Sequence, residues 1–151
     1  MKNTQHIGHL TEQRCFLKCM EMGFIVSRPL FDDARYDFIL DIGVRLLRIQ
    51  VKSSHWCDDE KSVFGFNGYS QHSNGKANKR MKYTKDEIDY FMTEIGGVFY
   101  LIPIEENGFG SKKLRIAAKQ DSQPSITWAR EYVFEKIING ELLKSVKGAH
   151  C

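Results

Sequence analysis

A carboxylate, an amide and an amine stand at Asp37, Gln50 and Lys52, in two segments that both have the composition of β-strands. Side chains alternate between the two faces of a strand, so Gln50 and Lys52 share one face of the second segment. If residues 42–44 form a hairpin turn, Asp37 lies across from the neighbourhood of Gln50, with about one residue of uncertainty in the register. The three polar groups are then expected on one sheet surface.

Such a set of groups could hydrolyse a phosphodiester with the help of Mg²⁺. Asp37 would supply an anionic oxygen ligand and Gln50 a neutral carbonyl ligand, while the metal neutralises the scissile phosphate. Lys52 would orient or deprotonate the attacking water and stabilise developing charge. Lys52 could instead be an ordinary exposed strand end, but its place in a polar row with Arg48 and Gln50 favours the functional interpretation.

One carboxylate and one amide make a poor magnesium site, so a further acid is expected, and Glu12 is the candidate. Residues 4–22 contain no proline and are followed by Gly23, which predicts a helix. On a helical wheel, Glu12 lies within about 60° of a small and apolar stripe. The stripe consists of Gly8, Cys15, Phe16 and Cys19. Burial of a carboxylate is costly unless a metal or cation offsets it, although a helix glutamate can also simply face water.

The remaining pattern predicts an α/β (α+β) domain, a mixed sheet flanked by helices on both sides. Strands are expected at residues 24–27, 36–41, 45–54, 96–104 and 114–117. Asp41 is expected to be a turn residue and not a ligand. Further helices are expected at residues 84–93, from the capping box of Thr84 and Glu87, and at residues 125–139, ended by Gly140. Residues 65–85, rich in Gly, Ser, Asn and Lys, are expected to form a long surface loop.

Length and composition fit a single domain of ordinary size covering residues 1–151, with 27% charged and 42% hydrophobic residues. No segment has the roughly 18 unbroken apolar residues of a membrane span, and the N-terminal segment lacks the apolar core of a secretory signal. We therefore expect a cytoplasmic protein that does not bind membranes. Cys15 and Cys19 are expected to be reduced core residues and not half of a metal site.

The net charge is +3, and much of the positive charge is concentrated in one segment. Residues 76–85 contain five lysine or arginine residues and no aspartate or glutamate. The segment is either a solvated loop or a DNA-contacting loop or ribbon, with lysines on phosphates and amides or arginine on base edges. The residues expected to contact DNA are Arg35, Ser54, Lys76, Asn78, Lys79, Arg80, Lys82 and Tyr83.

The succession of Glu12, GFIVSRP, RYDFILD and RIQVKSS resembles the core of the PD-(D/E)XK nucleases. In that superfamily a helix glutamate, a strand aspartate and a (D/E)-x-K strand build the metal site. Within it, the chain is similar to the group I intron homing endonuclease of this type from cyanobacteria, in which Q-x-K replaces (D/E)-x-K. Two departures are that Tyr36 and not proline precedes Asp37, and that Gln50 replaces an acid. Metal binding is therefore expected to depend more on Asp37 and Glu12.

The resemblance implies a restriction-endonuclease-like fold and a site-specific endonuclease that cuts double-stranded DNA and leaves 5′-phosphate ends. Mg²⁺ is the implied cofactor, with Mn²⁺ able to substitute, and Glu12, Asp37 and Gln50 are the implied ligands. One such site cuts one strand, so a homo-oligomer is expected, a dimer or a dimer of dimers on a long pseudo-palindromic site. The alternatives are a Holliday junction resolvase, a type II restriction endonuclease, or a non-catalytic DNA-binding protein on a nuclease fold.

Overall fold

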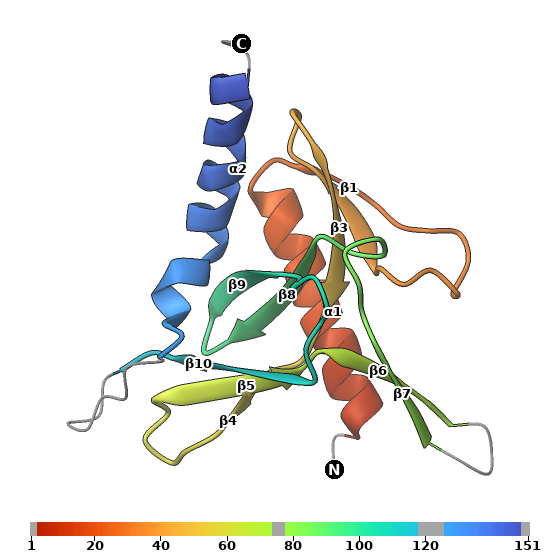
Figure 1. Cartoon of the computed structure of the whole chain (residues 1–151), viewed down its shortest axis with the longest axis vertical. Coiled ribbons are helices and arrows are strands. Elements are labelled where there is room, and N and C mark those ends of the chain that lie inside the picture. The colour runs from red at the N-terminus through yellow and green to blue at the C-terminus, as the bar shows by residue number, and fades with distance from the viewer. Residues whose placement is uncertain (1–2, 74–77, 118–125, 149–151) are drawn as a thin grey trace.

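A mixed five-stranded sheet forms the centre of the chain in the computed structural model, which describes residues 3–73, 78–117 and 126–148 (Figure 1). Neighbouring β3 and β8 run parallel, and the other neighbours are antiparallel. In spatial order the strands are β1 (Ile25–Ser27), β2 (Phe38–Asp41), β3 (Leu46–Val51), β8 (Tyr90–Ile95) and β9 (Val98–Pro103). This mixed sheet confirms the expected fold class.

The predicted hairpin between β2 and β3 is present. Its turn contains Gly43 with a φ of 87°, a conformation that glycine adopts without steric cost. The Gly43 N–H donates to Asp41 Oδ1 at 2.8 Å, so Asp41 is the turn residue that the sequence predicts. The register pairs Phe38 with Ile49, and both side chains are fully buried.

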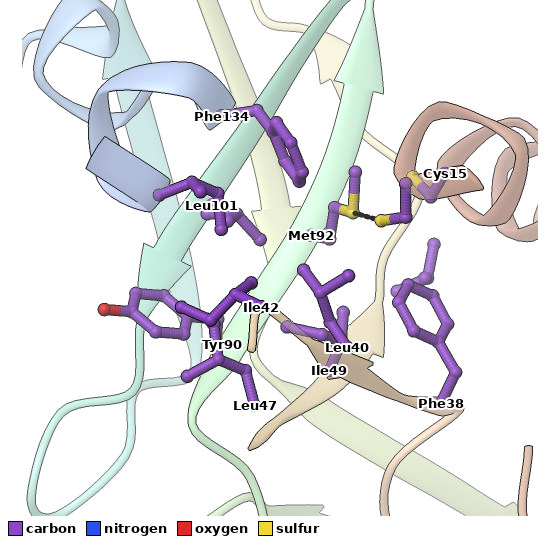
Figure 2. Close-up of a cluster of buried hydrophobic side chains, with 13 residues drawn as sticks. Cys15, Phe38, Leu40, Ile42, Leu47, Ile49, Tyr90, Met92, Leu101 and Phe134 are labelled. Carbon is purple, nitrogen blue, oxygen red and sulfur yellow. Dashed lines mark hydrogen bonds between the residues drawn. The ribbon is translucent and has the colours of Figure 1, made fainter. Parts of the chain in front are cut away.

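Both long helices cover the same face of the sheet. Helix α1 (Thr4–Glu21) and helix α2 (Phe134–Gly148) contribute to one apolar cluster with β2, β3, β8 and β9 (Figure 2). Among its members are Cys15, Cys19, Phe38, Leu40, Leu47, Ile49, Met92, Leu101, Phe134 and Ile138. The two cysteines are buried free thiols, and the Cys19 thiol donates to Met92 Sδ at 4.0 Å. They are core residues, as expected.

The opposite face is covered by a second sheet, so the expectation of helices on both sides is wrong in this respect. Its strands are β10 (Ser111–Arg115), β5 (Val63–Asn67) and β4 (His55–Trp56), all antiparallel. Phe64, Phe66 and Leu114 of this small sheet are buried against Phe91 and Ile102 of the central sheet. An apolar strand surface buries a sheet face as effectively as a helix does.

Most of residues 65–85 form strands, so the expected surface loop is wrong. After β5, strands β6 (Tyr69–Ser73) and β7 (Asn78–Lys82) form an antiparallel two-stranded ribbon that projects from the body of the protein (Figure 1). The register pairs Tyr69 with Lys82 and Gln71 with Arg80, so these four residues share one face. The segment has the polar composition of a loop because most residues of the ribbon do not pack into the apolar cores.

The predicted helix at residues 84–93 is absent, and the predicted helix at residues 125–139 is wrong in its position. Thr84 N and Oγ1 do donate to Glu87 Oε1, at 3.0 and 3.2 Å, but this pair closes a turn that leads into β8. Near the C-terminus, a short 3₁₀ helix, η1 (Ala129–Tyr132), precedes α2, which continues past Gly140. Burial of Phe134 and Ile138 stabilises α2 despite this glycine. No helix in the described ranges is long and apolar enough to cross a membrane.

Candidate active site

Asp37 lies just before β2 and makes two hydrogen bonds to the backbone of β3, one through its own backbone and one through its side chain. Its N–H donates to the Ile49 carbonyl at 2.8 Å, and its Oδ2 accepts from the Val51 N–H at 2.7 Å. Extending the β2–β3 register by one residue places Asp37 opposite Gln50, as the hairpin predicts. One carboxylate oxygen is thus fixed to the strand, and Oδ1 is left for another partner.

Asp37 and Glu12 line the same cleft. This cleft has a volume of about 340 Å³ and is bounded by α1, the segment 28–36 and the start of β2. The Glu12 side chain is 26% exposed, and its Oε1 lies 3.8 Å from Nη2 of Arg28. Glu12 therefore faces the cleft, as its place on the apolar stripe of the helix predicts.

Burial and the neighbouring Glu12 both disfavour the charged form of Asp37. The pKa of Asp37 is raised to about 6, chiefly by burial; the Val51 N–H opposes this shift, Glu12 adds to it, and Lys52 and Arg28 oppose it. A buried acid beside a second, partly exposed acid favours a bound cation, because the cation offsets both the desolvation cost of the buried acid and the repulsion between the two.

Lys52 extends from the end of β3 towards the ribbon. Its backbone N–H donates to the Met92 carbonyl at 2.9 Å, which continues the parallel pairing of β3 with β8. Its Nζ donates to the Tyr69 carbonyl at 2.9 Å and lies 4.9 Å from the centroid of the Tyr83 ring. Burial lowers the pKa of Lys52 to about 8, against the influence of Asp37 and with a smaller contribution from Arg35. A group whose pKa lies near the working pH can both accept and donate a proton, so this lowered pKa suits Lys52 to proton transfer.

Gln50 of β3 is the third candidate ligand, and it is not among the residues that line the cleft of Glu12 and Asp37. Its side chain is half-buried, and its Nε2 donates to the Val51 carbonyl at 3.4 Å, which leaves Oε1 as an acceptor. Within the described ranges there is no group of three or more His, Cys, Asp and Glu that could hold a metal. Two carboxylates and one amide oxygen, from Asp37, Glu12 and Gln50, are nevertheless hard ligands of the type that Mg²⁺ binds. The donor set fits a divalent cation.

The model of the PD-(D/E)XK endonuclease family matches residues 2–135. The chain belongs to this family. The structure is also similar to that of a bacterial homing endonuclease, I-Ssp6803I, with a TM-score of 0.70 and 22% sequence identity. The alignment covers 99% of this chain and 97% of that one, so the two share a fold over nearly their whole lengths. No curated protein sequence matches the chain.

In this PD-(D/E)XK endonuclease, three of the residues expected to contact DNA have partners within the protein. Tyr83 is only 4% exposed and packs edge-on against Phe91, so it belongs to the core, and its contact with DNA stays an untested prediction. Arg35 donates to groups on the ribbon and on Glu87. Ser54 Oγ lies 2.6 Å from Thr93 Oγ1 in a hydrogen bond.

The other candidates for DNA contact lie on the ribbon. The side chains of Lys79, Arg80 and Lys82 are exposed, and the Arg80 guanidinium lies 4.7 Å from the centroid of the Tyr69 ring. Asn78 is the first residue of β7, and Lys76 lies outside the described residues. For Lys79, Arg80 and Lys82, contact with DNA stays a prediction.

Two groups at the candidate site of this PD-(D/E)XK endonuclease, the Arg28 guanidinium and the Tyr69 carbonyl, could not be found from the spacing of residues in the sequence. Arg28 stacks on Phe16 at 4.3 Å and approaches Glu12, so it places a positive charge at the cleft. The Tyr69 carbonyl holds the Lys52 ammonium. Arg28 follows a short strand directly, which is a weak signal, and a backbone carbonyl gives no signal in a sequence.

Proposed function

We propose that this PD-(D/E)XK endonuclease cuts both strands of duplex DNA at a long pseudo-palindromic site, using Mg²⁺ held by Glu12, Asp37 and Gln50. Mn²⁺ would substitute, as a similar hard cation. The observation that carries the proposal is that Glu12 and Asp37 line one cleft while Lys52 lies within electrostatic reach of Asp37. The shared fold with a homing endonuclease supports a role in intron homing.

The proposed reaction is attack of water on the phosphorus, with cleavage of the P–O3′ bond to leave a 5′-phosphate and a 3′-hydroxyl. A bound divalent cation supplies charge neutralisation at the phosphate and lowers the pKa of water. Lys52 acts on the water and on the phosphate oxygens: its ammonium form stabilises developing charge, and its neutral fraction accepts a proton. Asp37 is kept oriented for metal binding by the Val51 N–H.

The ribbon gives this site a surface for reading DNA. Antiparallel two-stranded ribbons fit the major groove, where base edges are distinguishable. The ribbon begins at Tyr69, whose carbonyl holds Lys52, so the ribbon starts next to the proposed catalytic lysine. A duplex whose scissile phosphate lies at this lysine would therefore extend along the ribbon. Lys79 and Lys82 are the proposed phosphate contacts, and Arg80 is a proposed contact to phosphates or base edges.

The proposal is tested by cleavage of a library of random duplexes in Mg²⁺, with sequencing of the cut ends. Wild-type protein is expected to cut at a recurring sequence, and Asp37→Asn and Lys52→Ala are each expected to slow cutting by at least about 100-fold while retaining binding. Asp41→Asn is the matched control, because Asp41 lies on the same hairpin but only closes its turn.

Retained cutting in Asp37→Asn or Lys52→Ala would remove this mechanism. Binding by the wild type without cutting in Mg²⁺ or Mn²⁺ would favour the non-catalytic alternative. A four-way junction, assayed beside linear duplex, would identify a junction resolvase if it were the preferred substrate.

A further inference from the structure

The root of the ribbon, defined as Tyr69, Ser70, Met81 and Lys82, is bound by Arg35, which lies in the segment just before β2. Arg35 Nη1 donates to Ser70 Oγ at 2.5 Å, and Nη2 donates to the carbonyls of Lys82 at 3.1 Å and Met81 at 3.5 Å. The donors therefore reach both strands of the ribbon. The planar guanidinium is suited to this, because it presents five N–H donors in a fixed fork.

The same arginine is itself held in place. Its Nε donates to Glu87 Oε2 at 2.7 Å, and its side chain is only 21% exposed. Its guanidinium carbon lies 4.0 Å from the centroid of the Tyr83 ring, a cation–π contact with a ring that is fixed in the core. Such a guanidinium is committed to contacts within the protein and has little freedom to bind DNA.

Lys52 depends on the groups that Arg35 fixes. Its ammonium is held by the Tyr69 carbonyl, in the root of the ribbon, and lies over the same Tyr83 ring that Arg35 contacts. A lysine side chain has several rotatable bonds, so its position next to Asp37 depends on these partners staying in place.

We propose that Arg35 is a positioning residue for cleavage: by fixing the root of the ribbon, it places the Tyr69 carbonyl so that this carbonyl and the Tyr83 ring together hold the Lys52 ammonium beside Asp37. This inference rests on the proposed role of Lys52. It assigns to Arg35 a function in the rate of cutting and not in DNA affinity, in contrast to the expectation from the sequence. The recognition surface and the catalytic amine thereby share one support.

Arg80 is the matched control. It is also an arginine whose guanidinium lies over a tyrosine, but its side chain is exposed, and its guanidinium makes no hydrogen bond or ion pair with any residue that the structure describes. Replacement of Arg80 therefore removes a cation available to DNA, whereas replacement of Arg35 removes an internal support.

The test compares wild type, Arg35→Ala, Arg35→Lys and Arg80→Ala. Nicking of a supercoiled plasmid in Mn²⁺ is measured at saturating protein, and binding to a short duplex in Ca²⁺ is measured over a series of salt concentrations. Arg35→Ala is expected to lower the nicking rate constant by roughly 100-fold, the effect of a displacement of about 1 Å at a reacting group. Its affinity and salt dependence are expected to match the wild type. Arg80→Ala is expected to weaken binding and to make the log–log salt slope shallower by about 0.9.

Two further measurements separate positioning from charge and from general destabilisation. Arg35→Lys keeps the charge but not the fork, so it is expected to restore little of the rate. Hydrogen exchange is expected to increase in Arg35→Ala within residues 69–73 and 78–82 and to stay unchanged in α1 and β9. Thermal unfolding reports any global loss of stability.

Wild-type nicking by Arg35→Ala, full rescue by lysine, or unchanged exchange in the ribbon would each overturn the inference while the proposed function stands. Loss of affinity with a shallower salt slope in Arg35→Ala would also overturn it, and would return Arg35 to the DNA contacts. A wild-type protein that does not nick DNA would overturn both the inference and the proposed function.

Discussion

Among single residues, Asp37 carries the clearest conflict between stability and function. Its pKa is about 6 in the fold, and a carboxyl of this type has a pKa of about 3.9 in an unfolded chain. Below pH about 4 the carboxyl is protonated in both states and destabilises neither. Between pH about 4 and 6 the unfolded chain ionises this carboxyl while the folded protein keeps it protonated, so the free energy of unfolding falls as the pH rises through this range, and above pH about 6 the loss is complete and constant.

Asp37→Asn is therefore expected to stabilise the metal-free protein at pH 8, by about 1–3 kcal/mol. The amide oxygen of asparagine can still accept the Val51 N–H, and it carries no charge. Thermal unfolding in EDTA is the measurement, and the midpoint is expected to rise by about 2–4 °C per kcal/mol. The gain is expected to vanish near pH 4. An unchanged or lower midpoint at pH 8 would contradict the assignment of Asp37 as a buried charged ligand.

Metal binding is expected to reverse this order. Mg²⁺ is expected to bind the folded state of the wild type and so to raise its unfolding midpoint with increasing concentration. Asp37→Asn lacks one of the two carboxylates of the cleft, so its midpoint is expected to respond much less to Mg²⁺ in the same titration. Asp41→Asn keeps both carboxylates of the cleft and is expected to respond like the wild type. Equal responses in all three proteins would place the metal elsewhere.

Between elements, the connection from β5 to β6 decides where the ribbon starts. Gly68 lies in this connection, is buried, and donates its N–H to the Gly110 carbonyl at 3.1 Å. A Cβ atom at Gly68 would lie 2.4 Å from the Phe109 carbonyl oxygen and 2.6 Å from its ring. No side chain fits there unless the backbone moves.

Gly68→Ala is accordingly expected to destabilise the protein by about 1–3 kcal/mol and to lower the nicking rate, because the displaced strand carries the Tyr69 carbonyl that holds Lys52. Gly110→Ala is the control, since a Cβ atom at that position has no neighbour within 4 Å. Chemical denaturation and plasmid nicking of the two variants check this prediction. Equal behaviour of Gly68→Ala and Gly110→Ala would show that the connection tolerates movement.

The sequence predicts those elements whose signals are local. The first helix ends beside Gly23, the β2–β3 turn contains Gly43 and Asp41, and the alternation around Gln50 and Lys52 identifies the polar face of β3. These features depend on neighbours within a few residues, so period and turn chemistry are sufficient to find them.

The missed elements depend on partners far away in the chain. The strand β8 begins just after a capping box at Thr84, and pairing with β3 outweighs the local helix signal. The ribbon has few apolar residues, so the sequence gives no strand pattern there. Its strands are defined by their pairing with each other, from residue 69 with 82 to residue 73 with 78. Arg35 is a cation in the sequence; its three partners on the ribbon, 35 to 47 residues away, make it a structural support.

For the molecule as a whole, the number of active sites per chain limits how many DNA strands one copy can cut. In the described ranges there is one cleft that brings together Glu12 and Asp37, and the proposed catalytic lysine lies next to it. The strands of a duplex run in opposite directions, so a single site in one orientation meets only one scissile phosphate. Two copies related by a two-fold axis present one site to each strand, which also matches a pseudo-palindromic target.

Mixed oligomers make this expectation measurable. Wild-type chains and Asp37→Asn chains, unfolded together at equal amounts and refolded, are expected to give about half mixed dimers if chains pair at random. A mixed dimer binds the target with both copies but cuts only one strand, so nicked circles are expected to accumulate from a plasmid carrying the target. Wild-type protein alone is expected to give linear product, and Asp37→Asn alone is expected to give neither. If nicked circles from the mixture were converted to linear product as fast as with the wild type at half concentration, one chain would be cutting both strands in succession, and the symmetric arrangement would be wrong.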